Sequence, residues 1–476
     1  MTVAGPKLLM SFYGDDFTGS TDAMESLARA GLRTVLFVEP PTTEQLARYG
    51  GLAAVGVAGL TRSLPADQIE AKLAPALEAL GKLGAPIVHY KVCSTFDSSP
   101  AIGSIGRAID VGAKTFGARF VPVLGGAPAL GRYCVFGNLF ARSGPESVPF
   151  RLDRHPSMSR HPITPMDEAD LRVHLGRQTS KSFGLVDVLQ LNQDAAEADA
   201  HLEKLVAEGA EVVLIDLLHD SQLQAAGRML AVRAEHLRAG GAGPLFVVGP
   251  SGVEAALATW WRQKGAIESA MPFARLGPAK PLLVLSGSCS PVTARQIAWA
   301  LEHGFAEVPL DAAALAEGSK GKALEAAATV EVLRLLSEGR NVVIYTSRGG
   351  EDPAKGPVAE ALRKRGHDTM GIRTQSASVF GRALGRVLRA AASGSKVKRV
   401  VVAGGDTAGH VAREVGIESL EMIGELTPGA PLCRVYAPDS PADGLEITFK
   451  GGQIGKVDFL GLAAVGRAEV LRSWTG

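Results

Sequence analysis

Short apolar runs alternate with amphipathic runs along most of the 476-residue chain. Amphipathic stretches such as residues 67–82 and 195–209 have the apolar spacing of helices. The apolar runs are continuous rather than alternating, which is typical of parallel strands covered by helices on both faces. In the first half we predict strands at residues 8–12, 34–38, 53–58, 87–90, 120–124, 184–188, 212–217 and 245–248.

The alternation breaks at residues 263–279, which contain two prolines and little periodicity and are therefore predicted to be a linker. It then restarts, with predicted strands at 281–285, 342–345 and 400–403 and predicted helices at 293–303, 322–338 and 376–392. We predict an α/β protein of two domains, residues 1–262 and 280–476, each a mainly parallel sheet flanked by helices. The active site is expected in the cleft between them.

Residues 125–165 do not fit this alternation. They are rich in Gly, Pro, Arg and His, and we expect either an active-site insertion or a loop packed between the domains. Within them, His155 and His161 each precede a proline, and the three arginines nearby could bind an anion. The alternative is that both histidines only fix the geometry of the loop, and the sequence leaves their roles open.

The first predicted strand runs into DDFTGSTD, residues 15–22, ahead of an amphipathic run. In open α/β sheets this carboxyl end of a strand is where ligands bind. Helix capping by Asp or Thr explains one or two of these residues but not three carboxylates in eight positions. We therefore expect Asp15 and Asp16 to take part in catalysis.

Two further predicted strands also end in polar residues. The strand at 53–58 runs into TRS (61–63), and the strand at 87–90 runs into KVCSTFDS (91–98). Arginine binds carboxylates in a bidentate manner, and lysine offers a point positive charge. Each residue alone could be a solvated rim residue, but together they favour a pocket for a small, hydroxylated anion. The candidate substrate-binding residues are Arg62, Lys91, Ser94, Thr95 and Asp97.

Glycine-rich turns follow the predicted strands of the second half, at residues 286–290, 346–350 and 403–409, and a fourth candidate lies at 450–455. The third turn is expected to lead into a helix from His410. Backbone N–H groups at helix N-termini bind phosphate, and small residues allow a close approach. The candidate ATP-binding residues are Ser286, Ser288, Gly404, Gly405, Asp406, Thr407, Gly451 and Gly452.

Composition narrows the choice of function. The chain is 46% hydrophobic and 21% charged, with a net charge of +1, which fits a globular protein without the basic excess of a nucleic-acid binder. We find no signal-peptide layout and no membrane-spanning run, so no membrane partner is expected. The four cysteines are scattered and suggest neither disulfides nor zinc, which favours the cytoplasm. The sequence leaves open whether the protein forms a homo-oligomer.

The ordered set of motifs resembles the four-carbon acid sugar kinase family over nearly the whole chain. The matching segments are DDFTGSTD, TRS, KVCSTFDS, LSGSCSPVTARQ, AGGDTA and FKGGQIG. The resemblance implies a sugar-acid-binding N-terminal domain, an ATP-binding C-terminal domain and phosphorylation of a threonate, 3-oxo-tetronate or 3-oxo-isoapionate type of acid. Residues 151–172 look most like the oxo-isoapionate branch. Asp406 replaces a frequent Glu, and Gly452-Gln453 replaces a more usual Gly-Asn.

We therefore predict an ATP-dependent kinase that phosphorylates the terminal hydroxyl of a small sugar acid in carbohydrate catabolism. Asp16 is the candidate base, with Asp15 as the alternative. Mg²⁺ is expected between phosphate oxygens and carboxylates, with its protein ligands unassigned. Two rival functions remain: an aspartate-nucleophile phosphatase, which leaves the glycine turns without a role, and a non-catalytic sugar-acid-binding protein, which needs no ATP.

Overall fold

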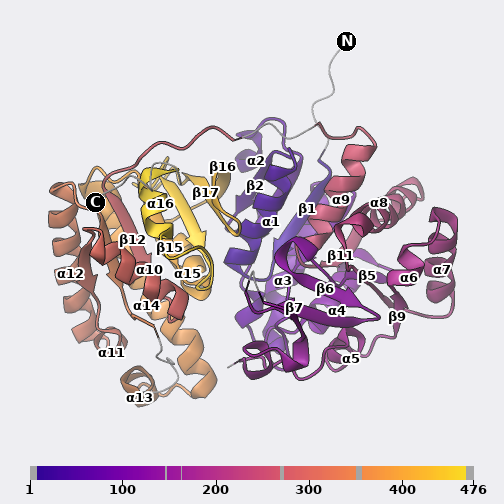
Figure 1. Ribbon diagram of the computed structural model, residues 1–476, viewed down its shortest axis with the longest axis horizontal. Helices are drawn as coiled ribbons and strands as arrows, with labels where there is room; N and C mark the ends of the chain where they lie inside the picture. Colours follow the sequence, from indigo (N-terminus) through magenta and orange to yellow (C-terminus); the bar gives the residue numbers. More distant parts are fainter. Residues whose placement is uncertain (1–7, 145–146, 162, 269–272, 350–355, 468–476) are drawn as a thin grey trace, which may run out of the picture. The chain divides into compact units, whose positions relative to one another are not determined.

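The computed structural model describes residues 8–144, 147–161, 163–268, 273–349 and 356–467. The chain divides into two compact units, residues 1–271 (the N-terminal unit) and 272–476 (the C-terminal unit). The division falls within the predicted linker, of which residues 269–272 lie outside the described ranges. Each unit is an α/β structure built on its own succession of strands, as predicted (Figure 1).

The N-terminal unit is built on a parallel sheet with the strand order β2-β3-β1-β4-β11-β5-β10-β9. Its strands lie within one or two residues of the predicted runs, and all of them except the edge strand β9 are buried along their whole length. They are β1 (Met10–Gly14), β2 (Thr34–Phe37), β3 (Ala54–Ala58), β4 (Ile87–Lys91), β5 (Val121–Leu124), β9 (Phe183–Val186), β10 (Val212–Ile215) and β11 (Leu245–Gly249).

The helices of this unit form two groups. One group contains α3, which packs on α4, and the other contains α9, which packs on both α1 and α8 (Figure 1). The helices are α1 (Phe17–Arg29), α2 (Thr43–Ala47), α3 (Ala66–Lys82), α4 (Ile105–Phe116), α5 (Leu171–Gly176), α6 (Val188–Leu191), α7 (Ala195–Ala207), α8 (Leu223–Ala239) and α9 (Gly252–Gln263).

The connections from β1 and β4 diverge although these two strands are neighbours. From β1 the chain passes through α1 and crosses β3 to reach β2, whereas from β4 it passes through α4 and crosses β11 to reach β5. In open α/β sheets, ligands bind outside the carboxyl ends of such a pair, where the strand order reverses. The topology alone therefore points to the residues that follow β1 and β4.

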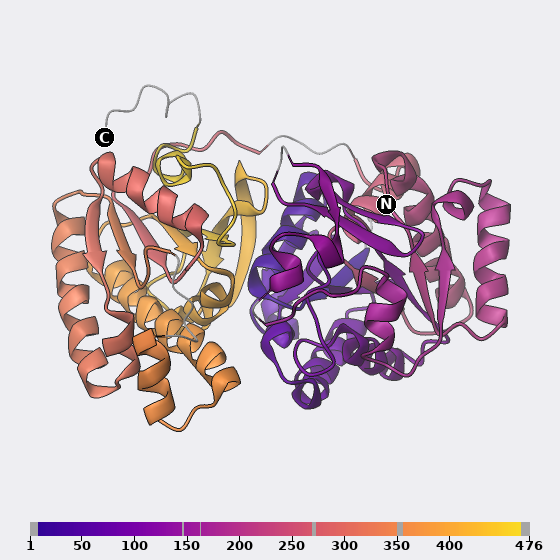
Figure 2. The ribbon, with the colours of Figure 1, turned by 60° about the horizontal axis from the view of Figure 1, so that its bottom comes forward.

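The region 125–165, which we expected to be either an active-site insertion or a loop packed between the domains, has secondary structure of its own. It contains a small antiparallel sheet of β6 (Arg132–Val135), β7 (Asn138–Arg142) and β8 (Pro149–Arg151), purple in Figure 2. The backbone N–H of Cys134 donates to the carbonyl of Leu217, 2.9 Å away, which joins this sheet to the chain just after β10. The pattern missed these strands because they are short and only partly buried.

The two histidines of this region fix local geometry. His155 Nδ1 accepts backbone N–H bonds from Ser157 and Met158, each 3.2 Å long. His161 Nδ1 accepts from the backbone N–H of Thr164 at 3.1 Å. Both rings thus act as turn acceptors, which agrees with the structural alternative. Pro162 lies outside the described residues.

The C-terminal unit has the strand order β13-β14-β12-β15-β18-β17-β16. From β13 to β18 the strands are parallel, and β17 is antiparallel to both of its neighbours. The strands are β12 (Leu282–Ser286), β13 (Ala306–Pro309), β14 (Val342–Tyr345), β15 (Arg399–Ala403), β16 (Ser419–Thr427), β17 (Ala430–Tyr436) and β18 (Glu446–Lys450).

In the C-terminal unit α14 packs on α12 and α15, and α10 packs on α16. The helices are α10 (Pro291–Glu302), α11 (Ala312–Ala316), α12 (Ser319–Ser337), α13 (Gly356–Lys364), α14 (Thr369–Gly394), α15 (Gly405–Val415) and α16 (Phe459–Val465). The strand order reverses again between the neighbours β12 and β15. From β12 the chain crosses β14 to reach β13, and from β15 it passes β18 and β17 to reach β16.

The prediction of a helix from His410 was wrong: α15 begins at Gly405. Gly404 has φ +125° and ψ 118°, a conformation that glycine alone adopts readily, and it turns the chain directly from β15 into the helix. Asp406 then lies in the first turn, where a negative charge is favoured by the helix dipole. The glycine-rich turn is therefore mostly helix N-terminus.

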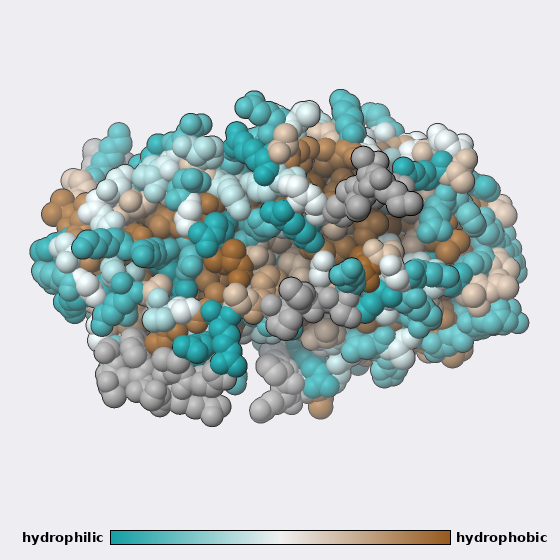
Figure 3. Space-filling view, turned by 90° about the horizontal axis from the view of Figure 1, so that it is seen from above, coloured by the Kyte–Doolittle hydropathy of each residue, from teal (hydrophilic) through white to brown (hydrophobic). Residues whose placement is uncertain are grey.

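No described helix is both long and apolar enough to cross a membrane. On the face drawn in Figure 3, hydrophobic patches are interrupted by hydrophilic residues.

Close packing of β3 on β1 gives a stability test. A Cβ on Gly56 would lie 2.1 Å from the Phe12 ring, which is fully buried. We expect Gly56→Ala to lower the free energy of unfolding by about 1–3 kcal/mol, because overpacking forces buried groups apart. Gly50→Ala is the control, since Gly50 is exposed and nothing lies within 4 Å of its Cβ position. Urea unfolding followed by circular dichroism measures both. Equal effects would contradict the packing that we describe.

Candidate active site

Asp15 and Asp16 follow β1 directly, and Asp16 caps α1. Asp16 has an extended backbone, with φ −139° and ψ 168°, and its Oδ1 accepts from the backbone N–H of Gly19 at 2.8 Å. Its Oδ2 accepts from the Thr18 hydroxyl at 2.8 Å. The capping alternative is thus correct for Asp16, and it does not exclude a second role, because the same carboxylate also contacts Arg62.

Arg62 joins the two aspartates. It lies in η1 (Thr61–Ser63) after β3, and its Nη2 is 2.8 Å from Asp15 Oδ1 and 2.9 Å from Asp16 Oδ1. Its Nε donates to Asp15 Oδ2 at 3.3 Å, so Asp15 is held in a bidentate manner. Arg62 retains 25% side-chain exposure, whereas the Asp15 side chain retains 2%.

The pKa values of this cluster are shifted. Burial raises the pKa of Asp15 above its usual value, although the Arg62 guanidinium acts in the opposite direction. Burial also works against the charge of Arg62, but the Asp15 and Asp16 carboxylates outweigh it and raise the Arg62 pKa well above its usual value. Perturbed groups at the carboxyl end of a sheet are typical of functional sites.

Lys91 is the last residue of β4 and brings a second cation to the same edge. Its Nζ lies 3.2 Å from Asp22 Oδ2, and its side chain is 3% exposed. Burial opposes its charge, but Asp22 and Glu254 outweigh burial and raise its pKa. Glu254, on α9, is itself fully buried and lies 3.1 Å from His89 Nδ1. Asp22 and Glu254 were not among the residues that we predicted for the site.

The loop after β4 supplies hydroxyl, thiol and carboxyl groups. The Thr95 hydroxyl donates to Asp97 Oδ1 at 2.6 Å and lies 3.1 Å from Cys93 Sγ. Phe96 has φ +53°, an uncommon conformation for a residue with a side chain, and it turns this loop back on itself. Burial raises the pKa of the Cys93 thiol to about 11. Ser94 lies in the same loop and is half-buried.

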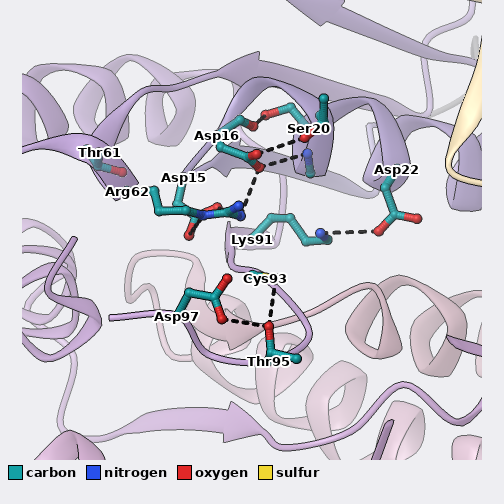
Figure 4. A network of polar contacts seen from close by, with 12 residues as sticks. Asp15, Asp16, Ser20, Asp22, Thr61, Arg62, Lys91, Cys93, Thr95 and Asp97 are labelled. Carbon is teal, nitrogen blue, oxygen red and sulfur yellow. Dashed lines mark hydrogen bonds and ion pairs between the residues drawn. The ribbon is translucent and has the colours of Figure 1, made fainter. Parts of the chain in front are cut away.

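The structure brings the predicted residues of the N-terminal unit to one edge of its sheet. Figure 4 shows Asp16, Arg62 and Lys91 near one another, with Thr95 and Asp97 in the loop below them. They come from three adjacent strands, β3, β1 and β4, which flank the point where the strand order reverses. Arg62 and Lys91 each form an ion pair with a carboxylate, so both cations are paired before a ligand binds.

In the C-terminal unit, the ends of β12, β15 and β18 are tied together by backbone bonds. Gly287 N donates to Ala403 O at 3.1 Å, and Gly404 N donates to Lys450 O at 3.0 Å. Ser286 ends β12 and is buried, and its hydroxyl accepts from the backbone N–H of Ser288 at 3.4 Å.

Small residues leave little room between these strand ends. A Cβ on Gly404 would lie 3.0 Å from Thr407 Oγ1 and 3.4 Å from the backbone nitrogen of Ser288. A Cβ on Gly452 would lie 2.8 Å from Ser288 Oγ. Together with Gly405, which begins α15, these residues form a set that we call the glycine cradle: Ser286, Ser288, Gly404, Gly405, Thr407 and Gly452. Gly451 adjoins it through Gly452, and Asp406 is exposed beside it.

Thr293 and Gln296 also belong to this region and were not predicted. Lys450 begins the fourth candidate turn but was not among the candidate ATP-binding residues. The Thr293 hydroxyl donates to Gly452 O at 2.8 Å, and Gln296 Nε2 donates to the carbonyls of Ile454, Gly455 and Lys456. Both side chains lie on α10 and hold the loop after β18. Of the turn at 346–350, Gly350 lies outside the described residues.

Comparison with known proteins defines the class. The sugar-binding N-terminal domain family matches residues 10–257, and the nucleotide-binding C-terminal domain family matches residues 283–460. The N-terminal part of the chain thus matches a sugar-binding domain family, and the C-terminal part matches a nucleotide-binding domain family.

Individual relatives narrow this class. A Paraburkholderia graminis protein named 3-oxo-isoapionate kinase is 43% identical and covers 97% of this chain and 95% of its own length. A Methylobacterium radiotolerans 3-oxo-tetronate kinase is 33% identical, with 96% and 98% covered. A solved structure from Salmonella typhimurium LT2 has a TM-score of 0.71 at 25% identity, with 94% and 97% covered. The chain belongs to the four-carbon acid sugar kinase family, and it is a kinase.

The Arg62 cluster predicts a pH-dependent stability. Arg62→Met leaves the Asp15 and Asp16 carboxylates without their shared cation, so we expect the melting temperature at pH 7.5 to fall by about 5 °C or more. Loss of Arg62 raises the already raised Asp15 pKa further. The uncompensated charge is therefore present above that pKa and is removed by protonation below it, so the deficit should shrink at pH 5.

Arg107→Met is the matched control, because Arg107 pairs with Glu70 at the surface. Its melting temperature should change by about 1 °C or less at either pH. Thermal unfolding of both variants and of the parent protein at the two pH values measures this. An Arg62→Met deficit that is the same at pH 5 and pH 7.5 would contradict the assignment of the buried charges.

Proposed function

We propose that this kinase transfers the terminal phosphoryl group of ATP to the terminal hydroxyl of a small sugar acid. One observation carries the proposal: each unit places a distinct polar set at the point where its strand order reverses. The N-terminal unit has carboxylates and cations there, and the C-terminal unit has the glycine cradle. We further propose a role in carbohydrate catabolism in the cytoplasm. Self-association stays a prediction.

The substrate that we propose is a 3-oxo-isoapionate type of acid, with 3-oxo-tetronate or threonate types as the related choices. The support is the 43% identity to the 3-oxo-isoapionate kinase, against 33% to the 3-oxo-tetronate kinase of Methylobacterium radiotolerans. These acids share a carboxylate, hydroxyls and a terminal primary alcohol. The residues predicted to bind the substrate in the N-terminal unit, Arg62, Lys91, Ser94, Thr95 and Asp97, together with Asp15 and Asp16, offer a complementary group for each of these. We call these seven residues the N-terminal set.

We assign the ATP phosphates to the glycine cradle. No side chain caps the N-terminus of α15, because Gly404 occupies the capping position. Backbone N–H groups there, together with the positive end of the helix dipole, favour an anion. A Cβ at Gly404 would press on Thr407, and a Cβ at Gly452 would press on Ser288, so glycine allows these strand ends to lie close together. We propose that their backbone N–H groups bind the phosphates from there. The adenosine would extend toward Gly451 and Gly452, and Asp406 would lie beside the phosphates.

We assign the sugar acid to the N-terminal set. Arg62 is the better placed of the two cations to bind the substrate carboxylate, because a quarter of its side chain is exposed. Lys91 is buried and adds positive charge to the same edge of the sheet. Ser94, Thr95 and Asp97 would bind the hydroxyls. Because Arg62 already holds Asp15 and Asp16, substrate binding would redistribute these contacts rather than create them anew.

In the proposed reaction the substrate oxygen bonds to the γ-phosphorus as the bond from that phosphorus to the β-phosphate oxygen breaks, which releases ADP. The hydroxyl proton passes to Asp16, or to Asp15 as the alternative. Asp16 is the better candidate because its side chain is 12% exposed, against 2% for Asp15. Since the two ligands are assigned to different units, phosphoryl transfer requires that the sugar acid and the ATP come together with water excluded.

The donor set fits a metal held largely by the nucleotide. No cluster of three or more metal-binding side chains occurs among the described residues. Mg²⁺ typically uses one or two carboxylates together with substrate phosphates and water, so a full protein cage is not needed. Asp15 or Asp16 would supply that carboxylate, and the metal would neutralise charge on the phosphates.

Asp16→Asn separates the chemical role of Asp16 from its capping role. Asparagine still accepts the Gly19 N–H bond, so the melting temperature should barely change. It cannot take the hydroxyl proton, so kcat should fall by at least about 100-fold. The assay couples ADP release to phosphorylation of a panel of sugar acids with ATP and Mg²⁺.

Asp194→Asn is the control, because Asp194 caps α7 in the same way and lies on an exposed turn. It should leave kcat unchanged. A near-normal kcat for Asp16→Asn would remove Asp16 from the mechanism. If no sugar acid in the panel stimulates ADP release by the parent protein, the proposed function is wrong.

A further inference from the structure

Lys450, at the end of β18, is a fully buried lysine with no carboxylate partner among the described residues. Its Nζ makes one hydrogen bond, to Thr293 Oγ1 at 3.1 Å, and lies 6.0 Å from the centre of the Phe459 ring. An ammonium group has three donors. A buried charge normally needs a partner of opposite sign, so the position of Lys450 calls for an explanation.

The surroundings of Lys450 connect it to the glycine cradle. Thr293, which accepts from Lys450, donates in turn to the carbonyl of Gly452. The carbonyl of Lys450 accepts from the backbone N–H of Gly404 at 3.0 Å. The lysine is thus bonded on one side to the residue before α15 and, through Thr293, to the loop that contacts Ser288. A single residue, Thr293, therefore links the Lys450 ammonium by hydrogen bonds to Gly452 of the glycine cradle.

We propose that the Lys450 ammonium is the buried counter-charge of the nucleotide phosphates, so that nucleotide binding is coupled to protonation of this lysine. The inference rests on the proposed function, because it takes the ligand of the cradle to be a nucleoside diphosphate or triphosphate. It adds a positioning residue, and it makes the affinity of the cradle depend on pH.

The charge state of Lys450 supports the coupling. Burial lowers the pKa of Lys450 to about 8, so in the free protein a part of the molecules carries the neutral amine near that pH. A phosphate nearby stabilises the ammonium and raises this pKa, and the protein must then take up a proton as the nucleotide binds. Affinity should accordingly decrease as the pH rises above 8.

The groups packed around Lys450 do not provide this charge. Its Nζ donates to Thr293 of α10 and lies 6.0 Å from the centre of the Phe459 ring of α16, and its register partner on β15 is Ala403. Burial alone accounts for the lowered pKa, with no contribution from a neighbouring charge. The titratable and charged residues on or next to the surrounding elements are Arg295 and Glu302 on α10, Arg399 on β15, Asp406, His410, Arg413 and Glu414 on α15, Cys433, Arg434 and Tyr436 on β17, and Asp458 before α16.

Calorimetric titration of the full chain with ADP and Mg²⁺ tests the coupling. At pH 8, in two buffers that differ in ionisation enthalpy, the parent protein should take up about half a proton per ADP, given a free pKa of about 8. Lys450→Met has a similar length but cannot titrate. It should abolish the uptake and weaken ADP by about 10- to 100-fold, while adenosine binds as before. Lys398→Met, at an exposed position before β15, is the control and should match the parent.

The outcomes separate the two proposals. If the parent protein binds ADP without proton uptake, or if Lys450→Met weakens adenosine as much as ADP, Lys450 is not the counter-charge and the nucleotide site itself still stands. If the parent protein binds neither ADP nor adenosine, the proposed function fails, and this inference fails with it. Because the uptake is measured first on the parent protein, the test does not depend on the folding of the variant.

Discussion

Parallel strands place their carboxyl ends at one edge of a sheet, and this constraint determines where the chemistry of this kinase lies. In the N-terminal unit the connections diverge between β1 and β4, and in the C-terminal unit between β12 and β15. In open α/β sheets, ligands bind outside the carboxyl ends of such strands. The same topology therefore underlies both sites that we propose, and the residues that follow the strands differ between them.

The charged side chains at the strand ends of the two units are balanced in different ways. At the first, Arg62 and Lys91 are each held by carboxylates, so the site contains its own compensating charges before any ligand binds. At the second, the N-terminus of α15 has no side-chain cap at Gly404, and the buried Lys450 has no carboxylate partner in the part of the chain that the structure describes. Cations that are already paired with carboxylates suit a ligand that must be oriented for proton transfer. A positive charge that has no carboxylate partner suits the negatively charged phosphates.

Much of the fold could be predicted from the sequence. Runs that are apolar on both faces predicted most of the buried parallel strands. The polar motifs after these strands predicted that Asp15, Arg62 and Gly404 are site residues, which stays a prediction. The sequence did not identify β6–β8, β13 or β16–β18. The strands β6–β8 are short and partly exposed, β13 alternates between buried and exposed residues, β16 and β17 are antiparallel, and β18 alternates polar and apolar residues. Lys450 and Glu254 were missed for another reason: a charged residue appears exposed in sequence, and only packing shows that it is buried.

Amide hydrogen exchange of the full chain, read by mass spectrometry, tests the central claim most directly, namely that each unit binds its ligand where its strand order reverses. ADP with Mg²⁺ should slow exchange in residues 286–290 and 404–407 and leave residues 15–22 and 91–97 unchanged, because ordered backbone groups at a bound phosphate open less often. A sugar acid that stimulates ADP release should give the opposite pattern. Protection of residues 15–22 by ADP, with none at residues 404–407, would contradict the account.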